Sequence, residues 1–374
     1  MAILPCLFLN YQPGTMNLIF DVHLDLSMNA LEWNRDLTLS IPEMREREQG
    51  MNDLKGRGGN TVNFESMRNG GVGLCVATQI GGCMKPAGPV ASWESPAQAW
   101  AMTQGQHAYY EAMTDLGEMT PIRNLEELDR HLPLWEDPIE AAKRKEPIGF
   151  IMSLEGADSI ITLDYLDKSF EKGLRALGPA HYGKGRYALG HDQDGGLPAN
   201  GQDLLRKMED LNLILDATHL SDGCFFEALD IFGGTVWASH SNSRSVVDNP
   251  RQFSDEQIKL LIERGAVIGS VFDAWMMIPN WDRGATTPES TGVTLENIVD
   301  HIDHICQLAG NSDHTGIGSD LDGGFGREQS PTDIDTIADL QKLESILSKR
   351  GYTSEDISKI FHRNFLRLLR NAWS

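Results

Sequence analysis

Residues 211–240 read LNLILDATHLSDGCFFEALDIFGGTVWASH, and this stretch decides the fold. An apolar run over 213–218 ends at His219, a segment of helical length follows, and a second apolar run over 235–239 ends at His240. The spacing of 21 residues from one histidine to the other corresponds to one helix, two turns and one strand. The stretch therefore predicts two neighbouring parallel strands, joined by a helical crossover and each ending in a histidine.

Short apolar runs of this kind recur along the chain, and segments of helical period follow most of them. Eight such units close naturally into a (β/α)8 barrel, so we predict an α/β protein with a TIM-type barrel and long strand-to-helix loops. A doubly wound sheet is the alternative. The predicted strands are 17–22, 72–79, 148–154, 174–178, 213–218, 235–239, 266–272 and 315–319. The clearest predicted helices are 255–264, 295–309 and 333–350.

We predict a single domain over residues 1–374, with its core at about 17–370, because no composition break, Pro/Gly/Ser-rich linker or internal repeat divides the chain. The chain is longer than a minimal barrel, and the surplus falls in three long loops at about 28–69, 81–98 and 183–201. Long loops beside barrel strands usually build a binding or catalytic site.

The net charge indicates which classes of partner to exclude, and the cysteines and the first residues indicate the compartment. The 54 acidic and 32 basic side chains give a net charge of -22, which repels nucleic acids and anionic lipids, so we expect neither nucleic acid nor membrane as a partner. The five cysteines include no C-x-x-C pair, and the short apolar run over 2–9 lacks the flanks of a signal peptide. We expect a cytoplasmic protein; a homodimer is left open.

Six of the eight predicted strands end in histidines or carboxylates, more than random placement would often give. In a barrel, the carboxyl ends of the strands form one rim, and catalytic groups sit there. We therefore expect one shared site on this rim. The polar groups at the strand ends are Asp21, His23 and Asp25, then Glu155, His181, His219 and His240, and finally Asp320 and Asp322.

The residue types on this rim suit a metal centre. His23 and Asp25 are two residues apart, so on an extended strand both project to one face and can bind one cation. His219 and His240 form a second pair on adjacent strand ends, and Glu155 lies between the two pairs. The mixed nitrogen and oxygen donors suit zinc better than calcium or magnesium. We predict two Zn²⁺ ions, bridged by Glu155 and by a hydroxide that serves as the nucleophile.

Other polar residues have simpler interpretations. His191 and Asp192 lie in a loop without a preceding apolar strand, and we interpret them as solvated surface. His301 shares a face of the helix predicted at 295–309 with His304, and neither is assigned a role. The spacing of two residues between Asp320 and Asp322 does not tell which of them is catalytic.

Six motifs make this sequence similar to the membrane (renal) dipeptidase family, whose members are zinc-dependent barrels of the amidohydrolase superfamily. The motifs are DVHLDL (21–26), SLEGAD (153–158), THLSD (218–222), SHSNSR (239–244), NPR (249–251) and GIGSDLDG (316–323). The resemblance runs from about Asn17 to Leu369. It implies that His23 and Asp25 hold one zinc, that His219 and His240 hold the other, and that Glu155 bridges them.

The resemblance also implies the roles of three further residues. Asp320 matches the acid/base aspartate of the family, His181 the histidine that binds the substrate carbonyl, and Arg251 the arginine that binds the substrate carboxylate. A surface arginine paired with Asp248 or Asp255 is the alternative for Arg251. Around His181 the chain reads GPAHYGKGR (178–186), where the family usually has Thr-His followed closely by Asn, and this departure concerns substrate choice.

The function implied by the resemblance is a binuclear zinc dipeptidase that hydrolyses the peptide bond of dipeptides with a free C-terminal carboxylate. Two alternatives stay open at this point. One is an amidohydrolase of the same fold acting on a lactone, an N-acyl amino acid or a phosphoester. The other is a barrel that binds a metal or ligand without turnover.

Overall fold

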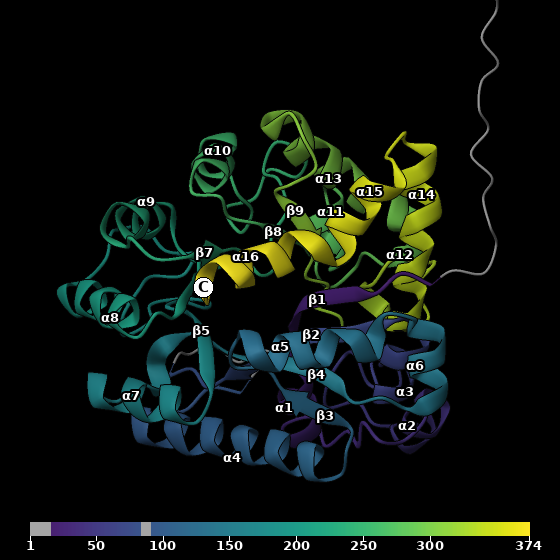
Figure 1. Ribbon diagram of the computed structural model, residues 1–374, viewed down its shortest axis with the longest axis horizontal. Helices are drawn as coiled ribbons and strands as arrows, with labels where there is room; N and C mark the ends of the chain where they lie inside the picture. Colours follow the sequence, from purple (N-terminus) through teal and green to yellow (C-terminus); the bar gives the residue numbers. More distant parts are fainter. Residues whose placement is uncertain (1–15, 84–90) are drawn as a thin grey trace, which may run out of the picture.

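The computed structural model describes residues 16–83 and 91–374, and in this part of the chain eight parallel strands form a nearly closed barrel with helices between them (Figure 1). The predicted (β/α)8 fold is confirmed. A single bridge from Ala238 to Ile268 connects the two ends of the sheet. The strands, in their order around the barrel, are β1 (Ile19–Leu24), β2 (Val72–Ile80), β4 (Ile148–Glu155), β5 (Leu174–Gly178), β6 (Ile214–Asp216), β7 (Val236–Trp237), β8 (Ile268–Ser270) and β9 (Thr315–Ile317).

Each of these eight strands starts within two residues of its predicted start, and several end earlier than predicted. An additional strand, β3 (Met119–Pro121), pairs with the beginning of β4 and was not predicted, because three residues are too short for an apolar pattern. The apolar run over 2–9 lies outside the described residues. In the part of the chain that is described, no helix has both the length and the apolar character needed to cross a bilayer.

The helices cover the outside of the barrel. Two predictions are confirmed: α13 has the predicted bounds, and α10, which begins after the capping residue Ser254, is one residue shorter than predicted. The helices are α1 (Leu26–Leu31), α2 (Ile41–Arg47), α3 (Phe64–Asn69), α4 (Pro96–Asp115), α5 (Leu125–His131), α6 (Pro138–Arg144), α7 (Leu163–Glu171), α8 (Ala199–Asp210), α9 (Asp222–Ile231), α10 (Asp255–Glu263), α11 (Ala274–Met277), α12 (Pro288–Thr291), α13 (Leu295–Ala309), α14 (Leu343–Lys349), α15 (Ser354–Ser358) and α16 (Asn364–Ala372).

The prediction of one helix over 333–350 is wrong for the first half of this range. The structure has a 3-10 helix at Ile337–Lys342, followed by α14. The Asp333 carboxylate accepts the backbone N–H of Leu295 at 3.0 Å. This bond holds residue 333 at the amino end of α13, where it satisfies a free helical N–H instead of starting a helix of its own.

Helix α16 closes the amino end of the barrel. Phe365 packs edge-on against Phe20 of β1, with ring centroids 5.9 Å apart, and against Trp237 of β7, at 6.1 Å. With Leu368 and Leu369 it joins the apolar cluster that fills the barrel. In Figure 1 this helix crosses the middle of the molecule in front of the strands. The opposite, carboxyl end of the barrel is therefore the one left for polar side chains.

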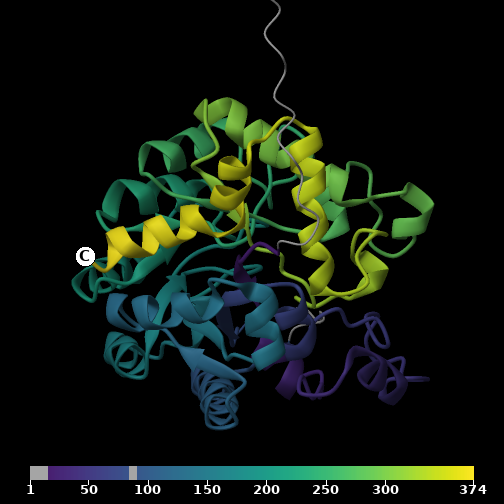
Figure 2. The same cartoon turned by 45° about the vertical axis from the view of Figure 1, so that its right-hand side comes forward.

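The first and last parts of the chain meet at β1. Figure 2 shows the purple-to-blue part on one side of the barrel and the green-to-yellow part on the other. Strand β1 is hydrogen-bonded to β2 on one side and to β9 on the other, with Asp21 opposite Ile317. The polar residues that end β1 thus lie between those of both halves.

Candidate metal centre

The first group of donors lies at the carboxyl ends of β1 and β4. The Nε2 atom of His23 is 3.8 Å from Oδ2 of Asp25 and 3.7 Å from Oε2 of Glu155. All three side chains are buried. The spacing of two residues does place His23 and Asp25 together, at the end of β1, where both side chains also lie near Glu155 of β4.

The second group lies at the ends of β6 and β7. The Nε2 atoms of His219 and His240 are 3.1 Å apart, and they lie 3.1 Å and 3.4 Å from Oε1 of Glu155. The two oxygens of Glu155 thus face different groups, Oε2 toward His23 and Oε1 toward the second pair of histidines. This is the arrangement that a bridging carboxylate requires.

Several of these donor atoms have no hydrogen-bond partner in the described part of the fold. Among the described residues, His23 Nε2, Asp25 Oδ1 and Glu155 Oε1 are buried and make no hydrogen bond. A buried polar atom without a partner costs free energy, and a cation bound between these atoms would remove that cost. Imidazole nitrogens with carboxylate oxygens are also the donors that zinc prefers. The residues present therefore fit a zinc centre.

The charges of the cluster favour a cation as well. Burial alone lowers the pKa of the His23 imidazole, but the neighbouring Glu155 and Asp25 carboxylates outweigh it and raise this pKa. Burial raises the pKa of Glu155. The first shift shows that the carboxylates stabilise positive charge on His23, and the second that the Glu155 carboxylate has lost its solvation, which a bound cation would replace. Potential ligand sets with atoms within 4.8 Å of one another are His23–Asp25–Glu155, Glu155–His181–His219 and His23–His240–Asp320.

Two further aspartates connect these strand ends through hydrogen bonds. The sequence analysis predicted this role for neither of them. The Asp21 carboxylate accepts the backbone N–H of Ser319 at 2.9 Å, which ties β1 to the segment after β9. In the same way, Asp216 at the end of β6 accepts the N–H of Ser239 at 3.0 Å. Each aspartate lies two or three residues before a histidine of the cluster, so the position of that histidine is set by a buried hydrogen bond between strands.

Asp320 and Asp322 have different surroundings, which the sequence spacing did not reveal. Oδ1 of Asp320 lies 3.7 Å from Nε2 of His23, inside the cluster. Asp320 has a left-handed backbone with φ of 58°, and its N–H donates to the carbonyl of His23. A side chain at Gly323 would collide with the Asp320 carboxylate, so this turn needs its glycine.

His181 and Arg251 lie against the second group. The rings of His181 and His219 are 4.7 Å apart between centroids. Arg251 is only 4% exposed, and its Nη2 donates to the carbonyl of His240 at 3.1 Å. The alternative of a surface arginine is therefore wrong. Within residues 16–83 and 91–374, Nη1 of Arg251 has no hydrogen-bond partner, so one edge of the guanidinium is free for a ligand.

His191 corrects another interpretation. Asp192 is exposed, as expected for a solvated loop, but His191 is not solvated surface: its Nδ1 lies 3.3 Å from Nδ1 of His219. The loop folds back because Gly190 forms an antiparallel bridge with Leu220. No local pattern indicates this contact, since a tertiary pairing creates it.

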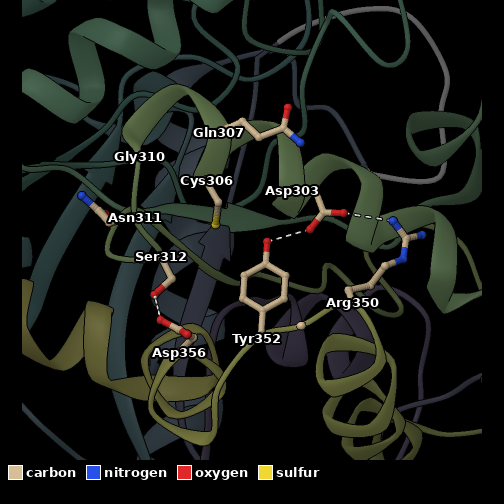
Figure 3. Close-up of a pocket in the computed structure, with 10 residues that line it drawn as sticks. Asp303, Cys306, Gln307, Gly310, Asn311, Ser312, Arg350, Tyr352 and Asp356 are labelled. Atoms are coloured by element: carbon tan, nitrogen blue, oxygen red, sulfur yellow. Dashed lines mark hydrogen bonds and ion pairs between the residues drawn. The ribbon is translucent and has the colours of Figure 1, made fainter. Parts of the chain in front are cut away.

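A separate cavity of about 440 Å³ lies at the other end of the barrel, between the end of α13 and residues 350–356 (Figure 3). Four of its polar side chains form two pairs: the Tyr352 hydroxyl donates to Asp303, and the Ser312 hydroxyl donates to Asp356. Ser312 precedes β9, so this cavity faces the amino ends of the strands. It takes no part in the metal centre.

Comparison with known proteins supports the resemblance seen in the sequence. A family model described as membrane dipeptidase (peptidase family M19) matches residues 15–373. The dipeptidase tcpJ of Claviceps purpurea is 26% identical over 286 residues, which make up 72% of this chain and 64% of tcpJ. An uncharacterised protein in the pqqA 5′ region of Klebsiella pneumoniae is 28% identical over 244 residues, or 63% of this chain and 86% of that protein.

Two solved structures share the fold over nearly their whole length. The dipeptidase AC, a metallo peptidase of family M19, superposes with a TM-score of 0.75 at 23% identity and covers 96% of this chain and 99% of its own. A metallo peptidase from Rhodobacter sphaeroides, liganded with a phosphinate mimic of the dipeptide L-Ala-D-Ala, has a TM-score of 0.74 at 23% identity and covers 96% of this chain and 100% of its own.

Proposed function

Because the chain belongs to the membrane dipeptidase family, a family of zinc-dependent metallo-dipeptidases, we propose that it hydrolyses the peptide bond of dipeptides that carry a free C-terminal carboxylate. One observation carries the proposal most directly. The two oxygens of Glu155 face separate groups of buried donors, while a free edge of Arg251 lies beside the second group. A binuclear centre next to a buried cation suits a substrate with both an amide carbonyl and a carboxylate.

In this proposal His23 and Asp25 would hold one zinc ion, His219 and His240 would hold the other, and Glu155 would contribute to both. When bound, the two ions supply an activated water at neutral pH and polarise the carbonyl of the scissile bond. His181 lies next to His219 and belongs to one of the potential ligand sets. We assign it to the substrate carbonyl, as the family resemblance implies. Burial lowers the pKa of its imidazole to about 4, so the neutral ring can donate one N–H to the carbonyl oxygen.

Asp320 moves the proton. Its carboxylate accepts a proton from the attacking water as the new C–O bond forms, and delivers this proton to the amide nitrogen as the C–N bond breaks. The products are two free amino acids, and Asp320 returns to its starting state. The left-handed turn at Asp320 serves this role because it directs Oδ1 to the donor cluster, 3.7 Å from His23 Nε2.

Arg251 fixes the other end of the substrate. Its guanidinium is anchored through Nη2 on the carbonyl of His240, so Nη1 is held in one orientation. A carboxylate bound there gains a charge-assisted hydrogen bond in a buried setting. This contact would select substrates in which the residue after the scissile amide carries a free carboxylate, as it does in a dipeptide.

The test is a substrate panel on the zinc-loaded protein, with zinc content measured on the same sample. We expect two zinc ions per chain, turnover of free dipeptides, and little turnover of the same dipeptides amidated at the C-terminus. Equal rates on the free and amidated forms, or turnover restricted to lactones or N-acyl amino acids, would reject the proposed substrate class. Zinc without any turnover would reject the proposed activity.

A further inference from the structure

We propose that His191 is a positioning residue for His219: its Nδ1 accepts a hydrogen bond from the Nδ1–H of His219 and so fixes which nitrogen His219 presents to the metal centre. The inference rests on the proposed zinc centre and adds to it a residue outside the ligand set. The contact that carries it is the 3.3 Å distance between the two Nδ1 atoms.

The two nitrogens of His219 have different surroundings. Its Nε2 faces the donor cluster, 3.1 Å from Glu155 Oε1 and 3.1 Å from His240 Nε2. A neutral imidazole that offers the lone pair of Nε2 to a cation carries its hydrogen on Nδ1. Two Nδ1 atoms at hydrogen-bond distance require one donor and one acceptor. His191 is therefore the acceptor and carries its own hydrogen on Nε2.

The backbone holds His191 in place from both sides. Gly190 pairs with Leu220 in an antiparallel bridge, and the N–H of Ser221 donates to the carbonyl of Leu189 at 2.9 Å. Residues 189–191 thus run beside residues 219–221. On the other side, the Asp192 carboxylate accepts the N–H of Gly183 at 2.6 Å. A loop fixed at these points can define the orientation of the ring it carries.

Two more features favour a positioning role. His219 has a left-handed backbone with φ of 67°, a conformation that costs free energy in a non-glycine residue and persists only when its surroundings hold it. The Tyr182 ring lies 4.7 Å from the His191 ring and packs against it edge-on. Among the described residues, none of the potential ligand sets includes His191, so it acts on the centre through His219.

The experiment compares zinc dissociation constants, measured by chelator competition on metal-free protein, for three variants. His191→Phe keeps a ring against Tyr182 but removes the acceptor, and we expect one of the two zinc ions to bind about 10–100-fold more weakly. His191→Asn keeps an acceptor oxygen near the position of Nδ1, and its affinity should stay within roughly threefold of wild type. Asp194→Asn, at an exposed position in the same loop, is the matched control and should change nothing.

Two readouts separate positioning from general loop damage. The visible spectrum of the cobalt-substituted protein should shift in His191→Phe and not in Asp194→Asn. Thermal unfolding of the metal-free variants should give similar Tm values. If His191→Phe does not fold, ¹H–¹⁵N spectra of zinc-loaded wild type still report the tautomers, with hydrogen on Nδ1 of His219 and Nε2 of His191 expected.

Unchanged zinc affinity in His191→Phe, equal weakening in His191→Asn, or the reversed tautomers would overturn the proposal. None of these measurements uses a substrate. A protein that shows the expected zinc affinities but hydrolyses no dipeptide therefore rejects the proposed function and leaves the role of His191 standing. Zinc binding that does not respond to His219→Ala rejects the zinc centre and this inference together.

Discussion

The Asp322 carboxylate accepts the backbone N–H of Thr61 at 2.8 Å, although 261 residues of sequence separate them. It also accepts the Thr61 hydroxyl and the N–H of Val62, and Nη1 of Arg35 lies 3.7 Å away. Asp322 thus fastens the segment after β9 to the long loop after β1. Asp320, two residues earlier, is left to face the donor cluster.

This difference between the two aspartates predicts that Asp320→Asn affects turnover and that Asp322→Asn affects stability. Asp320→Asn keeps the shape of the side chain but cannot move a proton, so we expect kcat to fall by roughly 10²–10⁴-fold with both metals and the free energy of unfolding retained. Asp322→Asn should instead lower the free energy of unfolding by about 1–3 kcal/mol, because it weakens buried hydrogen bonds. Steady-state kinetics and urea unfolding of both variants give the answer. Near-normal turnover in Asp320→Asn would remove it from the mechanism.

Glu155→Gln tests the bridge. The substitution preserves the volume of the side chain but removes the negative charge that would lie between two dications, and their repulsion in a buried site is strong. We expect at least one zinc ion to be lost per chain, along with activity. Asp158→Asn is the control, because Asp158 follows the same strand but accepts backbone N–H groups of Cys83 and Arg186. Elemental analysis that finds two tightly held ions in Glu155→Gln would show that the ions are held without this bridge.

Arg251→Lys tests the carboxylate contact. A lysine ammonium keeps the charge but lacks the planar fork that can hold His240 and a carboxylate at once. We expect kcat/KM for free dipeptides to fall by the worth of one charge-assisted hydrogen bond, about 1.5–3 kcal/mol. Rates on the amidated dipeptides should barely change. The control variant is Arg367→Lys, on α16 at the other end of the barrel, which should leave kcat/KM for both substrate forms unchanged. A variant with the same loss on both substrate forms would mean that Arg251 acts on the fold and not on the carboxylate.

His301 predicts an acid-sensitive step in stability. Its Nδ1 accepts the N–H of Ser243 at 3.1 Å, and its Nε2–H donates to the carbonyl of Met277 at 3.2 Å, so both nitrogens are used by the neutral ring. Burial lowers its pKa to about 4. Because the unfolded chain binds this proton near pH 6.5, the neutral ring stabilises the fold above pH 6.5, and this stability is lost as the pH falls toward 4, by up to about 3 kcal/mol.

The measurement is the free energy of unfolding of wild type and His301→Gln at a series of pH values. The variant should be less stable at neutral pH, and the difference between the two proteins should shrink between pH 6.5 and 4. Titration of the metal ligands cancels in this difference because both proteins share them. A difference that stays constant with pH would show that His301 does not titrate as a buried neutral ring.

The fold was predictable because each strand carries its own apolar run and because His219 and His240 repeat at the spacing of one strand–helix unit. The proximity of the polar side chains at the strand ends was predictable for the same reason, since parallel strands bring their carboxyl ends to one rim. What the pattern could not supply was anything set by contacts between distant segments. The pairing of Gly190 with Leu220 brings His191 to the centre, and the bond from Thr61 to Asp322 separates two aspartates that look equivalent in sequence.

Secondary structure shows the same limit. The long helix α13 has its predicted bounds, and in the structure Thr294 stands at its N-cap and Gly310 ends it in the left-handed conformation. The segment that begins at Asp333 has helical spacing too, yet its first residues are drawn to the end of α13 by a side-chain bond that only the folded protein contains. Local signals decide the structure where no tertiary contact opposes them.

The position of helix α16 has a consequence for folding during synthesis. The inner cluster of the barrel is complete only when Phe365, Leu368 and Leu369 have inserted into it, and β1 must wait for β9 before both of its edges are paired. During synthesis, the strands made first therefore expose apolar side chains and an open edge until residue 372 has emerged from the ribosome. The barrel can therefore close only after its last helix has been made, and until then the exposed strands are open to association with other chains.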